Sequence, residues 1–250
     1  MNWLSRSLVW ALGVLGAWQG LVVATGVPPF ILPGPVRVLE TLFESRTLIA
    51  GHALVTMGEV LLGLILGAIL GFATAIGIAS SDRMRGVLLP ILVFTQTIPV
   101  FALAPLLTLW LGYGLWSKVV MALIIIYFPV TSAFSDALLR TPPGWIDMAR
   151  VMGATPLRMM LRIKIPAALP GFASGLRLGA VYAPIGAIIG EWVGASQGLG
   201  YLMLLANGRA KTDLMFAALI TLAVLTLCLH SGIDRLCRRY LDRPDNATAT

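Results

Sequence analysis

The sequence contains few charged residues. Only 12% of its 250 residues are Asp, Glu, Lys or Arg, whereas a soluble domain carries roughly 25%. Hydrophobic residues make up 58%, and the mean hydropathy is +0.89. This composition excludes a soluble globular protein, which needs a polar surface, and a disordered chain, which has low hydrophobicity. The bilayer is therefore the expected solvent.

Cysteine and lysine are also scarce, and each shortage excludes a kind of site. The two cysteines, Cys228 and Cys237, have no His or Cys partners at metal-ligand spacing, so we assign no metal and no disulfide framework. The lysines are Lys118, Lys164 and Lys211, and none follows a glycine as the phosphate-binding P-loop requires. The chain therefore lacks this ATP-binding motif, and we assign it no cofactor.

Acidic residues are also few, with 11 in all, and their positions argue against an enzyme. A membrane-embedded enzyme would need paired acids, or histidines and acids at metal-ligand spacing, within its spans. Glu59 and Glu191 lie at the ends of apolar segments, and each stands without an acidic neighbour in the sequence. We therefore expect no catalytic residues.

Positive charge is in excess, with 18 Lys and Arg residues against 11 Asp and Glu. Membrane proteins concentrate Lys and Arg in their cytoplasmic loops, which explains the excess in so apolar a chain better than nucleic-acid binding does. With the N-terminus inside the cell, 13 basic residues lie on the cytoplasmic side and 5 lie outside. We therefore predict that both termini are cytoplasmic and that the chain binds no nucleic acid.

Long segments without charge predict the membrane-spanning helices. A helix that crosses the bilayer needs about 20 predominantly apolar residues. Six segments meet this requirement: 8–25, 60–81, 86–111, 116–138, 171–191 and 214–233. The sequence therefore predicts an all-α, multi-pass membrane protein with six transmembrane helices in contact with lipid.

Two segments outside the membrane have helical patterns. A proline followed by spaced apolar residues predicts a short surface helix over 36–43. The basic stretch 140–170 predicts a helix, a left-handed turn at Gly153, and a second short helix that begins at Pro156 and ends at Pro166. Such an amphipathic helix–turn–helix on the cytoplasmic face is suited to a groove on a partner protein.

The stretch 140–170 resembles the EAA signature of permeases in binding-protein-dependent ABC importers. In that signature, Glu-Ala-Ala is followed after three residues by Gly, and Ile-x-Leu-Pro follows after nine more. This chain has Asp147-Met148-Ala149, Gly153 and Ile163-Lys164-Ile165-Pro166 at the same spacing. Asp, Met and Ile replace Glu, Ala and Leu of the signature, and each replacement keeps the charge or the apolar character.

The resemblance extends over most of the chain, from about residue 29 to residue 239. Gln96-Thr97-Ile98-Pro99 and Gly198-Leu199-Gly200-Tyr201-Leu202 are similar to segments of the sulfonate, nitrate and taurine branch of these permeases. The resemblance implies the type I ABC importer permease fold in a bacterial cytoplasmic (inner) membrane. It divides the chain into a first transmembrane helix with an extracytoplasmic segment, an importer core with its coupling loop, and a basic cytoplasmic tail: 1–51, 52–234 with the loop at 140–170, and 235–250.

The resemblance also implies a division of labour among subunits. Two permease chains form the pathway, ABC ATPase subunits beneath them hydrolyse ATP, and a soluble extracytoplasmic binding protein delivers the cargo. A single unfused chain favours a homodimer of permeases. The resemblance implies that the loop at 140–170 contains the coupling helix, which docks on an ATPase subunit. The residues implied in ATPase coupling are Asp147, Met148, Ala149, Gly153, Ala154, Ile163 and Pro166.

Polar residues within the spans are candidates for the substrate pathway, because an unpaired polar group in hydrocarbon is costly. The candidates are Glu59, Gln96, Tyr127, Tyr182, Glu191 and Trp192. Glu59, at the outer start of the second span, can equally be a residue that reaches the membrane interface. Trp192 has the position of an interfacial anchor.

Three short segments bear on the cargo. Thr56-x-Gly58-Glu59, the segment 190–196 and the segment 213–219 resemble permeases for thiamine precursors of the hydroxymethylpyrimidine type. The branch pattern is also compatible with taurine, alkanesulfonate, nitrate or riboflavin. A secondary transporter without an ATPase is a further alternative, but it would need ion-coupling acids and inverted repeats that the sequence does not show.

Overall fold

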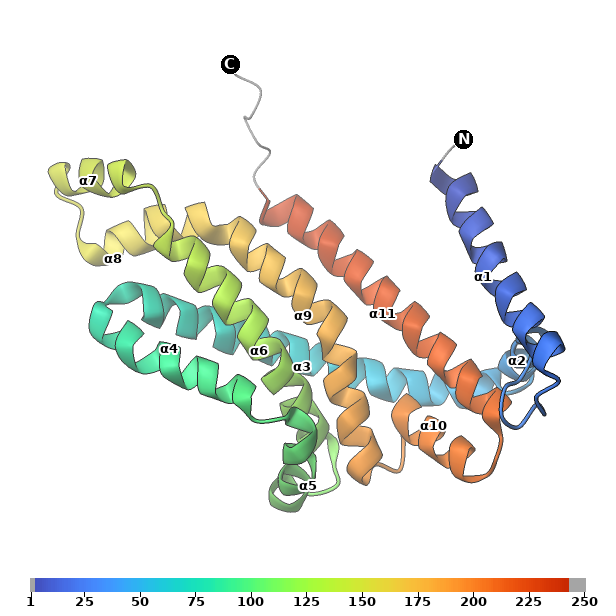
Figure 1. Ribbon diagram of the computed structural model, residues 1–250. Coiled ribbons are helices and arrows are strands. Elements are labelled where there is room, and N and C mark those ends of the chain that lie inside the picture. Colours follow the sequence, from blue (N-terminus) through green and yellow to red (C-terminus); the bar gives the residue numbers. More distant parts are fainter. Residues whose placement is uncertain (1–2, 243–250) are drawn as a thin grey trace.

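A computed structural model describes residues 3–242, with side chains described from residue 13 onward. This part of the chain is helical and contains no strand. Its α-helices, in chain order, are α1 Trp3–Thr25, α2 Pro35–Glu44, α3 Arg46–Ser80, α4 Asp82–Thr97, α5 Val100–Leu111, α6 Leu115–Leu139, α7 Pro143–Val151, α8 Pro156–Met159, α9 Ile165–Gly194, α10 Leu199–Gly208 and α11 Thr212–Tyr240 (Figure 1). A π-helical turn at Met160–Lys164 joins α8 to α9 without a break.

Helices α3, α6 and α9 form the core, and α6 packs closely against both of the others. Glycines bring the helix backbones together: Gly67 of α3 faces Ile126, and Gly175 of α9 faces the backbone of Val130. In lipid, helices associate through van der Waals packing, so small residues at the contact are effective. The glycines spaced four apart on α3 and α9 therefore serve packing within one chain.

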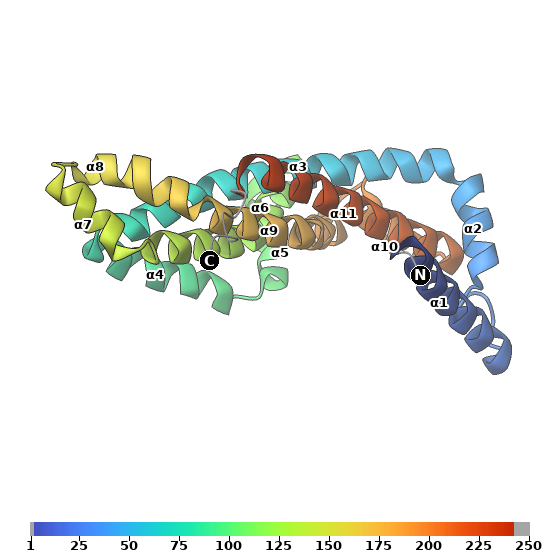
Figure 2. The same cartoon turned by 90° about the horizontal axis from the view of Figure 1, so that it is seen from above.

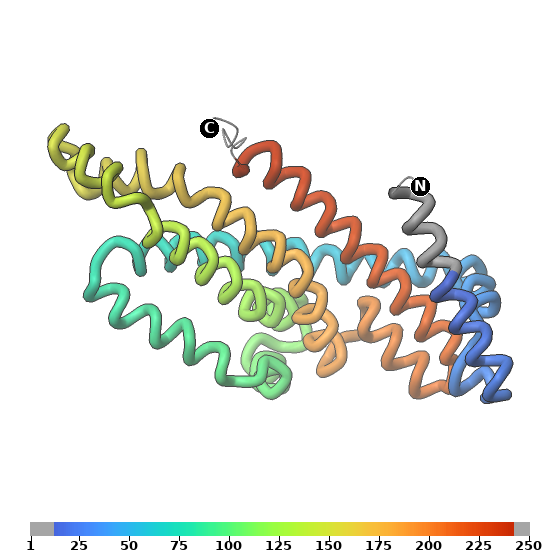
Figure 3. The backbone as a smooth tube through the Cα atoms, turned by 45° about the horizontal axis from the view of Figure 1, so that its top comes forward, coloured from blue at the N-terminus to red at the C-terminus, as the bar shows by residue number. Residues whose placement is uncertain are grey.

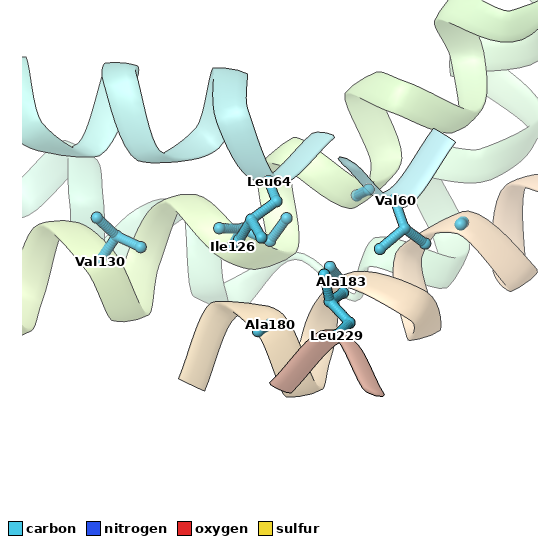
Figure 4. Packing of buried hydrophobic residues seen from close by; sticks show 9 residues of the cluster. Val60, Leu64, Ile126, Val130, Ala180, Ala183 and Leu229 are labelled. Carbon is cyan, nitrogen blue, oxygen red and sulfur yellow. The ribbon is translucent and has the colours of Figure 1, made fainter. Parts of the chain in front are cut away.

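Apolar side chains fill the space between these helices (Figure 4). Val60 and Leu64 of α3 meet Ile126 and Val130 of α6, and Leu229 of α11 packs against the same cluster. All five residues are at least nine-tenths buried. The interior is close-packed, so an added atom has little room.

Gly186 makes one of the closest approaches between α9 and α6. An added Cβ would lie 2.5 Å from Cα of Ala122 and 2.9 Å from the carbonyl oxygen of Met121, so only a backbone shift could make room. We expect Gly186→Ala to destabilise the protein by about 1–3 kcal/mol through overpacking, measured as a lower melting temperature in detergent. Gly58→Ala on α3, where an added Cβ meets nothing within 4 Å, is the control. Equal melting temperatures for the two variants would contradict this packing.

The molecule is elongated and has two distinct ends (Figures 1 and 2). The loop with α7 and α8 projects at one end, and α1, α2 and α10 gather at the other (Figure 3). At this second end, Trp18 of α1 stacks on Phe216 of α11 with ring centroids 5.6 Å apart. The surface helix predicted over 36–43 is confirmed as α2, whereas α10 was not predicted.

The third predicted span is not one straight helix. α4 and α5 meet at a bend of 96°. Pro99 cannot donate a backbone hydrogen bond, and Ile98 before it is extended, with φ −89° and ψ 119°. The prediction of one helix over 86–111 was therefore wrong, because the proline breaks an otherwise apolar segment.

Four helical segments are long and apolar enough to cross a membrane, namely α3, α6, Pro156–Gly194 and α11, and the bent pair α4–α5 makes a fifth if it is one span. α1 has 23 residues, but its side chains are described only from Gly13. The remaining predicted span, over residues 8–25 near the start of the chain, stays a prediction. Of the predicted tail, the first part continues α11 as far as Tyr240, and residues 243–250 lie outside the described residues.

Two helices extend beyond their predicted bounds. α3 begins at Arg46, so Glu59 lies well inside this helix and not at its start. The helix that begins at Pro156 continues to Gly194, so the prediction that Pro166 ends it was wrong. Proline is tolerated there because it lies in the first turn of α9, directly after the π-helical turn has changed the hydrogen-bond register.

Candidate functional site

The loop between α6 and α9 is a capped helix–turn–helix. α7 ends in a Schellman motif, in which the N–H of Gly153 donates to the carbonyl of Arg150 and the N–H of Ala154 donates to that of Ala149, both at 2.9 Å. Gly153 has a φ of +73°, a left-handed conformation that glycine adopts at no steric cost. The side chain of Thr155 then accepts a backbone N–H of α8. The left-handed turn predicted at Gly153 is confirmed.

Large apolar side chains of α7 are exposed. Trp145 is 51% exposed, Met148 62% and Val151 90%. Beside them is a hollow of about 370 Å³, lined by Trp145, Met148, Ala149, Met152, Arg162 and Ile163. A cluster of exposed apolar side chains of this kind marks a surface that a partner protein or a membrane covers.

The predicted coupling residues take different positions in this loop. Asp147 lies in the middle of α7 and is exposed, and its carboxylate is 3.0 Å from the guanidinium of Arg150. Met148 and Ile163 line the hollow. Ala149 is buried and accepts a hydrogen bond of the Schellman turn. Pro166 is not among the hollow's lining residues and lies in the first turn of α9.

A second cavity lies among α4, α5, α6 and α9. Its volume is about 550 Å³, and it brings together two of the predicted pathway residues, Gln96 and Tyr182. Its other lining residues are Val100, Ile125, Phe128, Pro129, Ser132, Ala133 and Leu178. Among the described residues, those that line this cavity carry no charge, and their polar side-chain groups are an amide, a phenol and a hydroxyl.

The other predicted pathway residues lie apart from this cavity. The hydroxyl of Tyr127 contacts Oγ1 of Thr74 at 3.2 Å, between α6 and α3. Trp192 lines a separate, mostly apolar hollow of about 400 Å³ together with residues of α10 and α11. Glu59 and Glu191 are buried among the helices.

Glu59 of α3 and Glu191 of α9 form a buried acid cluster with Thr56 and Lys118. The two glutamates are 3% and 1% exposed, and their carboxyl groups lie near each other. The Thr56 hydroxyl donates to Oε1 of Glu191 at 2.6 Å. The interpretation of these acids as isolated was therefore wrong, because helix packing brings together residues that are distant in the sequence.

Lys118, which sequence reasoning did not select as a site residue, joins three segments at this cluster. Its ammonium group donates to the carbonyl of Tyr113, to that of Gly114 at 2.9 Å, and to that of Gly194 at the end of α9 at 3.0 Å. These bonds use all three donors of the ammonium group. A lone lysine at the start of an otherwise uncharged span is the sequence signal that could have identified it.

Membrane-length helices with an exposed, capped helical loop at one end agree with the permease resemblance of the sequence. The sequence matches the family described as "Binding-protein-dependent transport system inner membrane component" over residues 49–242. The chain belongs to this family. It is therefore an inner-membrane permease that works with an ATPase and a substrate-binding protein, as the resemblance implied.

Three relatives cover most of the chain. A probable ABC transporter permease protein of Haemophilus influenzae is 50% identical over 228 residues, or 91% of this chain and 93% of the relative. The formylaminopyrimidine transport permease protein of Halalkalibacterium halodurans is 35% identical over 209 residues, or 83% and 84%. The riboflavin transport system permease protein of Chloroflexus aurantiacus is 37% identical over 228 residues, or 89% and 85%.

The fold is also found in a solved transporter. A chain of the methionine ABC transporter MetNI, in an inward-facing conformation, matches with a TM-score of 0.70 over 80% of this chain and 99% of that chain. The sequence identity is 21%, so this likeness concerns the fold alone. The type I ABC importer permease fold predicted from the sequence is confirmed.

Proposed function

We propose that this chain forms the translocation pathway of an ATP-driven importer for a small, uncharged polar ring compound that a soluble binding protein delivers. One observation supports this most strongly: a single unbroken helix, Pro156–Gly194, links the exposed loop to the cavity. It begins three residues after Gly153 and carries the cavity residues Leu178 and Tyr182. A displacement of the loop therefore moves one wall of the cavity.

The α7 loop is the coupling element in this proposal. The exposed side chains of Trp145, Met148 and Val151 insert into an apolar groove on the ATPase, as amphipathic helices commonly do. The Schellman turn and the Thr155 cap keep the loop stiff, so that motion of the ATPase reaches α9. The ATPase subunits hydrolyse ATP, and their closure opens the pathway toward the loaded binding protein.

Two copies of the chain enclose the pathway, with both termini in the cytoplasm. Tyr182 lines the cavity and is nevertheless 44% exposed, which leaves the cavity open on one side for the same surface of a second copy. The distribution of basic residues supports the orientation, because most Lys and Arg residues then lie on the cytoplasmic side.

A neutral ring suits the cavity better than an anion does. Phe128 and Tyr182 offer aromatic faces, and Gln96 and Ser132 offer hydrogen-bond donors and acceptors. A sulfonate or nitrate ion would meet no cationic side chain among the described lining residues, and an unpaired charge is costly to desolvate. We therefore infer a cargo of the hydroxymethylpyrimidine type. The relatives named for formylaminopyrimidine and riboflavin transport support a neutral heterocycle over taurine, alkanesulfonate or nitrate.

Tyr182→Ala is expected to slow uptake of hydroxymethylpyrimidine about ten-fold, because it removes a stacking face and a hydroxyl that are together worth about 1–2 kcal/mol. Uptake of labelled cargo into proteoliposomes that contain the complete importer measures this. Trp192→Ala, outside the cavity, is the control and should keep the wild-type rate. Equal rates for the two variants would contradict the assignment of this cavity to the pathway.

Purification of the tagged chain with its partners tests the proposed role. We expect an ATPase to co-purify and its activity in lipid to rise when the binding protein carries hydroxymethylpyrimidine. The activity could instead rise only with a binding protein that carries taurine, an alkanesulfonate, nitrate or riboflavin. That result would support the importer role and contradict the proposed cargo. A purified chain that transports without any ATPase would establish the secondary-transporter alternative.

A further inference from the structure

Helix α2 has one broad apolar side, and the rest of the protein covers only part of it. Val38 is buried and packs together with Leu42 against α10 and α11. The uncovered edge of the apolar side consists of three exposed side chains, Val36, Leu39 and Phe43. With about 3.6 residues per turn, the charged residues lie together on the opposite side of the helix, namely Arg37, Glu40 and Glu44. Phe43 is 68% exposed, so the edge needs an apolar environment outside this chain.

The contacts of α2 with α11 place it beside a membrane-length helix. Val38 belongs to one cluster with Ala217 and Ala218, which lie one to two turns inside α11. The hydroxyl of Thr212 at the start of α11 donates to the carbonyl of Phe30, in the loop before α2. Since α11 is long and apolar enough to cross a membrane, α2 lies alongside the first turns of a span and not beyond its end.

Helix α1 gives a similar depth for α2. The chain folds back after Thr25, and a Cβ added at Gly34 would lie 3.2 Å from Oε1 of Gln19. Gln19 lies six residues before the end of α1, which is about 9 Å along the helix axis. The part of α1 whose side chains are described, Gly13–Thr25, is apolar. At this depth α2 runs across the end of α3 and not along it (Figure 2).

An ion pair fixes the rotation of α2 about its own axis. Nε of Arg37 lies 3.2 Å from the carboxylate of Asp213, the second residue of α11. This contact joins the charged side of α2 to the polar beginning of α11. Glu40 and Glu44, on the same side of α2, are exposed. The charged side is therefore directed toward water at the end of the span, and the apolar edge is directed away from it.

We propose that α2 is an interfacial helix, whose edge of Val36, Leu39 and Phe43 inserts among the lipid acyl chains of the leaflet that lies away from the α7 loop. Interfacial helices bury their apolar face about 5–10 Å into the boundary between headgroups and acyl chains, which agrees with the depth given by Gln19. A soluble protein that docks and leaves would return the edge to water each time, whereas a bilayer covers it permanently. In this position α2 anchors the ends of α1 and α11 at a fixed depth.

Spin labels on the two sides of α2 test the proposal in the assembled importer in liposomes. Cys228 and Cys237 are first replaced by alanine, and a label is then attached to Val36→Cys, Phe43→Cys or the matched control Glu40→Cys. Oxygen partitions into acyl chains, whereas a nickel chelate stays in water. We expect oxygen to broaden the spectra at positions 36 and 43, and both positions to lose the broadening by the chelate that position 40 shows.

Three results would overturn the proposal. Broadening by the chelate at positions 36 and 43 as strong as at position 40 would show that the edge faces water. Protection of both positions from oxygen and chelate alike would show that a second copy of the chain covers the edge. Loss of oxygen access only after the loaded binding protein is added would assign the edge to that protein. The readout does not depend on transport, so this proposal and the transport role fail separately.

Discussion

Gly153→Val is expected to reduce ATP-driven uptake by about ten-fold or more while the chain still inserts at wild-type abundance. Gly153 has a φ of +73°, a conformation that costs a residue with a side chain roughly 1–2 kcal/mol and a β-branched residue more. A shift of about 1.4 kcal/mol corresponds to a factor of ten in the population of correctly turned loops. Uptake into proteoliposomes, normalised to the amount of inserted chain, measures the effect.

Two control variants separate the turn from the mere loss of a glycine. An added Cβ at Gly153 meets nothing within 4 Å, so the effect comes from the backbone conformation and not from a clash. Gly153→Asn should retain most uptake, because asparagine tolerates the left-handed region. Gly144→Ala, also in open space and on the same loop, should behave as wild type. Normal uptake by Gly153→Val would refute the coupling role of this turn.

Lys118→Met is expected to lower the free energy of unfolding by about 3 kcal/mol or more, because it removes three hydrogen bonds from a charged donor, each worth about 1.5–3 kcal/mol. Methionine nearly keeps the length of the side chain but removes the ammonium group. The carbonyl groups of Tyr113, Gly114 and Gly194 lose their shared donor. Thermal and denaturant unfolding of the purified protein in detergent measure the loss.

Lys211→Met is the matched control for this variant. Lys211 is exposed, directly before α11, and a surface substitution away from such contacts usually changes stability by no more than about 0.5 kcal/mol. If Lys118→Met unfolded at the same temperature as Lys211→Met, the ammonium group would not hold the α5–α6 loop, α6 and α9 together.

The coupling loop was predictable because its signals are local. Gly153, Thr155 and Pro156 follow one another closely, and each acts on the backbone within a few residues. The turn, the cap and the start of the second helix therefore follow from the sequence alone. The exposure of Trp145 and Met148 follows less directly, because it depends on how α6 and α9 direct the loop away from the core.

Helix ends were less predictable, because proline has opposite effects at two positions. Pro99 separates α4 from α5, whereas Pro166 lies within one continuous helix from Pro156 to Gly194. The π-helical turn at Met160–Lys164 makes the difference. Residue spacing in the sequence contains no sign of this turn.

The acid cluster could not be predicted, because it depends on contacts between distant residues. Thr56 and Glu191 are 135 residues apart and meet only when α3 and α9 pack side by side. From the sequence, Glu59 is expected near a membrane interface, at the start of a span. In the structure, α3 continues beyond Glu59 in both directions. Only the glycines at 198 and 200 gave a local indication of a close approach.

Photo-crosslinking from the α7 loop tests the central claim, that this loop couples the chain to an ATPase. A photoreactive amino acid replaces Val151, which is 90% exposed, in the assembled importer; the control replaces Val36 of α2, which is 65% exposed at the opposite end. We predict a covalent product with the ATPase from position 151 and none from position 36. No ATPase product from position 151 in a transport-competent complex, or equal yields from both positions, would contradict the account.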